Sequence, residues 1–417
     1  MRALIFLVLI GCLSEPSRPH GAGPPIAPGS VARSKIAVGD LNGDGYDDLV
    51  VLGNEYAPGM HPTAFVYFGG ETLENPDVRL DLTIDDPSDP MPQWYEPLYP
   101  QIFISTADHT RGLTVLSGQD SAPKVPHDVQ IPRTCYTSFF PTLGRGFAPR
   151  VHSDGSGLSN GGYAGDPLNV PVFAVTRDPT MTPPIREYAF GYDQVWTYGE
   201  LAAGAQRSND GSWDVGQYEG TNHYMQDVFE LPPVAGTVSE DLLLVTTARA
   251  YRTRGDGPTF QMTSAGIELS GGGRRTARGA LSGDHFFAAA TAEFGSENVT
   301  IIDVQGGSDP LGYNLVTKSH HAPTDMWPAD VAGGTTIDLV TLEDQALSVY
   351  RDLSLSTDST YAELVSLREA QLGYDLVAVG NFHGDAQDEI YLIDSADLSQ
   401  PLRCYRIGST LDRCPNE

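Results

Sequence analysis

Residues 38–52 read VGDLNGDGYDDLVVL, an Asp- and Asn-rich loop that runs into an aliphatic segment. Oxygen-bearing side chains recur at alternate positions of this loop, with a glycine at position 6. Ca²⁺ takes about six to eight oxygen ligands, and a loop with oxygens at positions 1, 3, 5, 7 and 9 can surround one ion. Glycine at position 6 permits the sharp turn that such a loop needs. We therefore expect calcium at this loop, with the ligands Asp40, Asn42, Asp44, the main-chain carbonyl of Tyr46, and Asp48.

The loop is not an EF-hand, although its spacing begins like one. An EF-hand requires a glutamate at position 12 and a following helix. Position 12 here is Val51, inside the run 49–52, which predicts a buried strand. The pattern Asp-x-Asn-x-Asp-Gly-x-x-Asp before a short aliphatic strand resembles the FG-GAP (or VCBS) repeat, a family that builds β-propellers such as the integrin α-subunit head. An ordinary Asp- and Gly-rich turn is the alternative interpretation.

Weaker copies of the loop occur at residues 233–243, 293–301, 330–340 and 381–390. The last copy keeps oxygens at positions 1, 5 and 9, so Asn381, Asp385 and Glu389 are the candidates for a second, weaker calcium site. Its histidine at position 3 is a poor calcium ligand, because calcium prefers oxygen donors. The copy that begins at Asp330 keeps only positions 1 and 9. In the FG-GAP family some repeats have lost their ligands, so the resemblance implies that the weaker copies are structural remnants.

The strands after these loops predict a regular repeat. Expected strand starts lie near residues 49, 242, 299, 339 and 390, and two further members are expected at 113–116 and 172–175. The resulting units are about 40–70 residues long, and repeats of this size with four short strands each are typical of a β-propeller. We therefore expect an all-β chain in which residues 31–417 form a seven-bladed β-propeller.

The composition agrees with an all-β protein. The 417 residues include 45 Gly and 31 Pro, and the apolar residues occur in short runs rather than in long stripes of helical period. The formal net charge is −29, from 25 Lys and Arg against 54 Asp and Glu. Such a surface repels phosphate backbones, which argues against nucleic acid as a partner, and it suits divalent cations or basic partners. Solubility alone is the alternative explanation of the charge.

The first 30 residues predict export and a lipid anchor. Residues 1–11 combine a positive start, a short apolar run and a small residue before Cys12, as in a bacterial lipoprotein signal peptide. We expect cleavage before Cys12 and lipidation of its thiol, with a Pro- and Gly-rich tether over residues 12–30. Leu13, where an aspartate would favour the inner membrane, favours the outer membrane of the cell envelope. A secretory signal with an incidental cysteine is the alternative.

Two cysteines lie close together near the C-terminus, and an exported chain permits disulfides. We expect Cys404 and Cys414 to form a disulfide that holds the end of the last blade. Closing a loop of this size stabilises the fold by roughly 2.5–3 kcal/mol on the chain-entropy description.

The remaining motifs do not indicate catalysis. Residues 157–161 match G-x-S-x-G, but the flanking residues predict neither the preceding strand nor the following helix of a nucleophile elbow. We therefore expect a binding function for a lipid-anchored envelope protein, whose calcium-stabilised propeller presents loops to a protein or glycan partner. The alternative is an enzyme, namely a polysaccharide lyase or hydrolase with charged residues around the central channel of the propeller.

Overall fold

The structure is a computed structural model that describes residues 36–42, 44–52, 63–70, 73–81, 98–105, 112–119, 133–139, 141–142, 146–147, 151–154, 172–177, 185–190, 195–199, 207–208, 225–231, 242–246, 249–255, 260–262, 266–269, 278–282, 285–291, 298–305, 308–316, 323–332, 337–343, 346–351, 353, 364–368, 374–384, 387–395, 397–398 and 401–414. The leader predicted at 1–11, the lipidation site Cys12 and the tether at 12–30 lie outside the described residues. Within those ranges, no helix has the length and the apolar character needed to cross a membrane.

The elements are β-strands, and they form seven antiparallel sheets of four or five strands. The first sheet contains β1 (Ile36–Gly39), β2 (Asp48–Leu52), β3 (Thr63–Tyr67) and β4 (Val78–Asp81). The second has the order β10 (Val151–Asp154), β7 (Arg133–Phe139), β6 (Gly112–Gln119) and β5 (Leu98–Ser105). The third contains β11 (Val172–Arg177), β12 (Ile185–Phe190), β13 (Val195–Gly199) and β14 (Arg207–Ser208). A separate pair is formed by β8 (Pro141–Thr142) and β9 (Gly146–Phe147).

The remaining four sheets follow in chain order. The fourth contains β15 (Met225–Glu230), β16 (Leu242–Thr246), β17 (Arg249–Gly255) and β18 (Phe260–Met262), with β19 (Ile267–Glu268) also paired to β17. The fifth contains β20 (Arg278–Ser282), β21 (His285–Thr291), β22 (Asn298–Gln305) and β23 (Leu311–Val316). The sixth contains β24 (Asp325–Ala329), β25 (Asp338–Glu343), β26 (Ala346–Tyr350) and β27 (Leu364–Arg368). The last contains β28 (Leu376–Gly380), β29 (Glu389–Ile393), β30 (Arg403–Ile407) and β31 (Leu411–Arg413).

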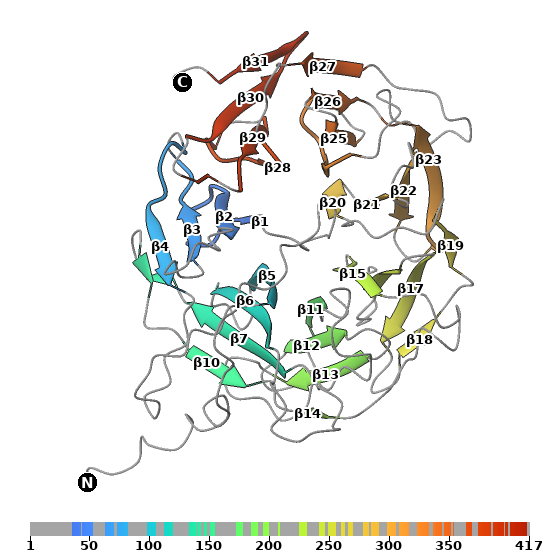
Figure 1. The fold of residues 1–417 in the computed structure, drawn as a ribbon. Coiled ribbons are helices and arrows are strands. Elements are labelled where there is room, and N and C mark those ends of the chain that lie inside the picture. The colour runs from blue at the N-terminus through green and yellow to red at the C-terminus, as the bar shows by residue number, and fades with distance from the viewer. Residues whose placement is uncertain are drawn as a thin grey trace, which may run out of the picture.

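Figure 1 shows these sheets as a ring, with β1, β5, β11, β15, β20 and β28 on the inside and β4, β10, β14, β23 and β31 on the outside. Inner strands of neighbouring sheets contact each other, as β20 contacts β24 and β24 contacts β28. β28 also contacts β1, so the last sheet lies against the first. The predicted all-β propeller is therefore confirmed. The number of blades stays a prediction, and the seven sheets of the described part of the chain agree with it.

Strand β2 of the first sheet is buried on both faces, which explains its uninterrupted aliphatic sequence. In β2, Leu49 and Val51 belong to a cluster shared with the last sheet, whereas Val50 and Leu52 belong to a separate cluster. Successive side chains of a strand point to opposite faces of the sheet, so β2 is covered on both sides. The corresponding strands β25 and β29 are likewise buried along their whole length.

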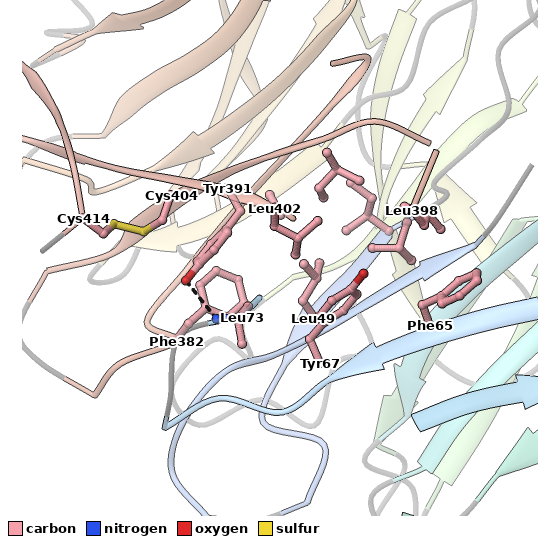
Figure 2. Close-up of a cluster of buried hydrophobic side chains, with 14 residues drawn as sticks. Leu49, Phe65, Tyr67, Leu73, Phe382, Tyr391, Leu398, Leu402, Cys404 and Cys414 are labelled. Carbon is pink, nitrogen blue, oxygen red and sulfur yellow. Dashed lines mark hydrogen bonds between the residues drawn. A yellow bond between two sulfur atoms is a disulfide. The ribbon is translucent and has the colours of Figure 1, made fainter. Parts of the chain in front are cut away.

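The ring closes between the first and last sheets without a shared strand, because β1–β4 are all N-terminal and β28–β31 are all C-terminal. Figure 2 shows side chains of the two sheets meeting in one buried cluster, among them Leu49, Tyr67, Phe382 and Tyr391. The amide of Leu73 donates a hydrogen bond to Tyr391 Oη at 3.5 Å. Cys404 and Cys414 form a disulfide that belongs to the same cluster (Figure 2). We call this contact between the first and last sheets, including the loops of both that meet there, the seam.

The expected strand starts near residues 49, 242, 339 and 390 correspond to β2, β16, β25 and β29, each the second strand of its sheet. The segment 293–301 is different, because its strand is β22, the third strand of the fifth sheet. Its interpretation as a shortened copy of the Asp-rich loop is therefore wrong. The segment 172–175 lies in β11, a first strand. Inner strands of a sheet covered on both faces have similar aliphatic sequences, so their place in the sheet cannot be told from the apolar run alone.

Candidate metal centre

The Asp-rich loop connects β1 to β2. Gly39 pairs with Asp48 across the two strands, so residues 40–47 form the hairpin connection. Within it Gly45 has a φ of 94°, a conformation that glycine adopts more readily than other residues. A Cβ at Gly45 would meet nothing within 4 Å. The glycine at position 6 is therefore required by the backbone conformation and not by close packing.

The first three predicted ligands accept hydrogen bonds from amides of their own loop. Asp40 Oδ2 accepts from the amide of Gly45 at 3.1 Å. Asn42 Oδ1 accepts from the amide of Asp44 at 2.9 Å, and Asp44 Oδ1 accepts from the amide of Tyr46 at 2.9 Å. The side-chain amide of Asn42 also donates to Asp44 Oδ2 at 2.8 Å. These bonds hold the loop folded while Asp44 stays exposed to solvent.

Asp48, the predicted ligand at position 9, is fully buried and anchors the loop. Its Oδ2 accepts from the amides of Leu41 at 2.7 Å and Asn42 at 3.2 Å, and its Oδ1 accepts from the amide of Gly69 at 2.9 Å. Burial raises the pKa of Asp48 to about 6, with a further contribution from the charge of Asp44 and against the lowering effect of the three hydrogen bonds. Asp44 and Asp48 therefore bring two negative charges close together in this loop.

The donors of the loop fit calcium in kind, because carboxylates, a side-chain amide and a main-chain carbonyl are oxygen ligands of the type that Ca²⁺ prefers. Their placement is less complete. Among the described residues, no three Asp, Glu, His or Cys side chains form a group that could hold a metal ion. Asp48 Oδ2 also accepts amides of the loop, and Asp48 Oδ1 accepts the amide of Gly69 after β3. Calcium binding therefore requires Asp40 and Asp44 to turn toward Asp48, and the site stays a prediction.

Residues 381–388 form the corresponding hairpin connection between β28 and β29, where Gly380 pairs with Glu389. Glu389 is fully buried, like Asp48 in the first sheet. Its Oε2 accepts from the amides of Phe382 at 2.9 Å and His383 at 3.2 Å. The two loops are thus anchored by their ninth-position acids in the same way.

Glu389 additionally has an arginine and a histidine as neighbours. Its Oε1 accepts a hydrogen bond from Nη2 of Arg406, and Nδ1 of His383 lies 3.3 Å from Oε2. Within the described part of this loop, Asn381 Oδ1 is buried and has no hydrogen-bond partner. Asp385 lies outside the described residues. The second calcium site of Asn381, Asp385 and Glu389 therefore stays a prediction, and one of its three ligands is already paired with an arginine.

The sixth sheet contains a third copy of the anchor. Asp338 is buried, and its Oδ2 accepts from the amide of Ala332 at 2.9 Å. The ninth-position acid therefore holds the loop in three sheets, two of which lack the full set of oxygen ligands. Sequence reasoning treated this acid only as a ligand and missed its structural role. The signal was present, because the acid persists in copies that have lost other oxygens.

Asp47 is a further residue that sequence reasoning missed, and it joins the two loops. Its amide donates to the carbonyl of Asn381 at 3.0 Å, and its Oδ2 accepts from the amide of Asn381 at 2.8 Å. Burial raises the pKa of Asp47, against the lowering effect of the Asn381 hydrogen bond and with the charges of Asp40 and Glu389 adding to the rise. Asp47 therefore links the first and last sheets at the candidate site.

Asp388 occupies the same position 8 in the last loop. Burial, followed by the charges of Asp47, Glu389 and Asp330, raises the pKa of Asp388 to about 6. Carboxyl groups of the first, sixth and last sheets thus influence one another. The signal in the sequence is the acidic pair at the start of each strand, at 47–48 and at 388–389.

The third strands of the first, sixth and last sheets, β3, β26 and β30, place different residues next to the buried acid that anchors each loop. The residue after the anchoring acid pairs with a tyrosine in each sheet: Leu49 with Tyr67, Leu339 with Tyr350, and Ile390 with Tyr405. The residue after that tyrosine is Phe68 in the first sheet, Arg351 in the sixth and Arg406 in the last. The first sheet therefore has a buried phenylalanine at the register position where the other two sheets have an arginine.

Comparisons with known proteins match one segment of the chain in sequence and most of the chain in structure. Residues 32–63 match the family model described as FG-GAP repeat, and this segment includes the Asp-rich loop with β1 and β2. No curated protein sequence matches the chain. Among solved structures, the chain is similar to BBS1N in complex with ARL6DN, with a TM-score of 0.48, 11% identity, and coverage of 89% of this chain and 91% of that chain.

Two further similar structures are enzymes by name. The rhamnogalacturonan lyase YesW has a TM-score of 0.44 and 11% identity, with 89% of this chain and 71% of that chain covered. A mutant of the NanB sialidase from Streptococcus pneumoniae has a TM-score of 0.31 and 9% identity, with 91% of this chain and 77% of that chain covered. The resemblance expected from residues 38–52 is confirmed by the family match, and the chain carries an FG-GAP repeat at residues 32–63.

Proposed function

We propose that the protein is a lipid-anchored binding or scaffold protein of the bacterial cell envelope, and that calcium stabilises its FG-GAP loop. In this proposal the propeller presents its loops to a protein or glycan partner outside the cytoplasm. Cys12 carries the lipid, and the Pro- and Gly-rich tether at 12–30 holds the propeller away from the membrane, which is the outer membrane if Leu13 acts as a sorting signal. The acidic chain, at a net charge of −29, favours basic or calcium-bridged partners over phosphate-rich ones.

The observation that carries the calcium proposal is the presence of two neighbouring negative charges, Asp44 and Asp48, in the 40–48 loop. The charge of Asp44 helps to raise the pKa of Asp48, although three amides donate hydrogen bonds to the Asp48 carboxylate. The corresponding acid of the last sheet has Arg406 beside it, whereas the first sheet has Phe68 at that register position. A divalent cation would offset the repulsion between the Asp44 and Asp48 carboxylates.

The residues that would hold the ion are Asp40, Asn42, Asp44, the carbonyl of Tyr46, and Asp48. Calcium would supply positive charge and would bind several oxygen ligands at once. The chain contributes a loop that amide hydrogen bonds already hold folded. Less ordering is therefore needed on binding than for an unfolded segment, since ordering each residue opposes binding by about 1–2 kcal/mol.

Thermal unfolding tests the calcium proposal. The full chain is compared after metal removal and after calcium addition, beside an Asp44→Ala variant. We expect calcium to raise the melting temperature of the wild type and to leave the variant unchanged, because Asp44 is an exposed ligand whose loss does not disturb the core. An equal rise in both proteins would place the ion elsewhere, and no rise in either would leave the loop as a turn without metal.

The lipid anchor has an independent test. We expect the mature chain to carry acyl groups on Cys12 by mass spectrometry and to sediment with membranes. A Cys12→Ala variant should appear in the soluble fraction, because the propeller itself supplies no anchor in this proposal. Wild-type protein that lacks acyl groups and remains soluble would contradict the anchor without touching the calcium site.

A further inference from the structure

The two loops that resemble each other also touch each other, although more than 300 residues separate them. The amide of Asn381 donates to Asp47 Oδ2 at 2.8 Å, and the amide of Asp47 donates to the carbonyl of Asn381 at 3.0 Å. One residue further, the amide of Gly70 donates to the carbonyl of Phe382 at 2.7 Å. Two hydrogen bonds thus join the candidate calcium loop to the last sheet, and the Gly70 bond crosses the seam beside them.

Tyr46 fills the space between the same two loops. A Cβ on Gly384 would overlap Cε1 of the Tyr46 ring and lie 2.7 Å from Cδ1. A Cβ on Gly69 would lie 2.7 Å from Cβ of Tyr46, and one on Gly70 would lie 3.4 Å from Cδ2. The side chain of position 7 is therefore enclosed by glycines of both sheets, while its main-chain carbonyl belongs to the predicted calcium ligands.

The last sheet holds its half of this contact with hydrogen bonds and an ion pair of its own. Glu389 is paired with Arg406 and accepts the amides of Phe382 and His383, so the 381–384 segment is held by groups of its own sheet. In the first sheet, Phe68 stands at the register position that Arg406 has in the last sheet. We therefore expect the 40–48 loop to be the side of this contact whose conformation depends on calcium.

We infer that calcium in the 40–48 loop stabilises the contact between the first and last sheets, by fixing Tyr46 and Asp47 in the positions from which they contact the last sheet. We call this effect of calcium on the seam the latch. The inference rests on the proposed calcium site. Residues 46 and 47 lie between the proposed ligands Asp44 and Asp48, so an ion held by both sides limits where Tyr46 and Asp47 can move. Coupling of this kind is reciprocal, and closure of the seam therefore raises the affinity of the loop for calcium.

Amide hydrogen exchange measures the latch directly. In the full chain, we expect calcium at about 100 times its dissociation constant to slow exchange of the Asn381 and Gly70 amides by about a hundred-fold, because opening the seam releases the ion. The amide of Val377 donates to Asp325 Oδ2 at 2.9 Å between the sixth and last sheets, and it serves as the internal control. Its exchange should not change.

Calorimetric titration of the same sample separates two ways of failing. If no calcium binds, the proposed calcium site is wrong and the latch fails with it. If calcium binds and the exchange of Asn381 and Gly70 is unchanged, the calcium site stands and the latch is overturned. Slowing that is equal at Val377 would show general stabilisation instead of a latch, and it would also overturn the inference.

A matched pair of glycine variants tests the route through Tyr46. Gly384→Ala places a methyl group against the Tyr46 ring at a φ of 72°, and Gly266→Ala does the same against the Tyr251 ring at a φ of 73°, in the fourth sheet. We expect Gly384→Ala to bind calcium more weakly and to show less than about a ten-fold slowing at Asn381. Gly266→Ala should keep the full effect. Equal behaviour of the two variants would contradict coupling through Tyr46.

Discussion

The 40–48 loop of the first sheet and the 381–389 loop of the last sheet share a buried acid but differ in the groups that surround it. Each loop wraps around a buried acid, Asp48 or Glu389, whose oxygens accept amides from the start of the loop. In the last sheet Arg406 also contacts that acid. In the first sheet the loop carries the side-chain oxygens of the half-buried Asp40 and Asn42 and of the exposed Asp44. The difference teaches that the anchor belongs to the fold, whereas the way its charge is balanced belongs to the individual sheet.

Removal of Arg406 is expected to have the largest effect on the difference between the two loops. We expect Arg406→Met to lower the free energy of unfolding by about 3–5 kcal/mol, because Glu389 is fully buried and would keep an unpaired charge. Urea denaturation of the metal-free protein measures this loss. The double variant Arg406→Met with Glu389→Gln should recover a substantial part of it, since no buried charge is then left without a partner. A loss below about 1 kcal/mol in the single variant would show that the ion pair does not stabilise the loop.

The next largest loss of stability is expected from a change in the packing of Tyr46 against the 381–389 loop. We expect Gly384→Ala to destabilise the metal-free protein by about 2–3 kcal/mol, the sum of a left-handed backbone conformation and overlap with the Tyr46 ring. Gly45→Ala is the matched control, because it has a φ of 94° and open space around its Cβ, so only the backbone contribution of about 1 kcal/mol remains. Equal losses, measured by urea denaturation, would mean that the Tyr46 contact contributes nothing.

Much of the first sheet could be predicted from the sequence, because its determinants are local. The spacing of oxygens, the glycine at position 6 and the aliphatic run that becomes β2 all lie within residues 38–52. The pairing of Cys404 with Cys414 was likewise expected from proximity in the chain. Short-range patterns of this kind report backbone conformation and burial directly.

The seam could not be predicted, because its contacts join residues at opposite ends of the chain. Nothing local to Asp47 indicates that its carboxylate accepts the amide of Asn381. Nothing local to Gly384 indicates that its missing side chain leaves room for Tyr46. The role of Arg406 also depends on strand register, since it becomes visible only when Ile390 is seen to pair with Tyr405. Ring closure therefore creates the part of the site that sequence patterns do not contain.

Titration offers a smaller effect that distinguishes the two loops. In the metal-free protein, the folded-state pKa values of Asp48 and Asp388 are each raised to about 6 from an ordinary 3.8, so the folded state binds more protons than the unfolded state between these values. The stabilisation is present in full below pH 3.8 and is lost as the pH rises through 6. After allowance for solvent screening, we expect each carboxyl to contribute about 1–2 kcal/mol to this decrease.

Variants and calcium assign the two contributions. Asp48→Asn and Asp388→Asn should each flatten the dependence of the urea midpoint on pH between about pH 4 and pH 7. Saturating calcium should remove only the contribution of Asp48, because the ion favours the carboxylate form of its own ligand. If calcium also removes the contribution of Asp388, or removes neither, the proposed difference between the loops is incorrect.

The smallest expected effect is the sharpest test of what the exposed oxygens of the first loop are for. Asp44 is exposed and its Oδ2 accepts the side-chain amide of Asn42 at 2.8 Å, a contact of the kind that contributes little in water. In the metal-free protein, Asp44→Asn should therefore change the free energy of unfolding by less than about 0.5 kcal/mol. The same variant should bind calcium much more weakly in a calorimetric titration, because one carboxylate ligand has become an amide. A loss above about 1 kcal/mol without metal would instead mean that Asp44 holds the loop together, as Arg406 and Glu389 do in the last sheet, and that its charge needs no ion to explain it.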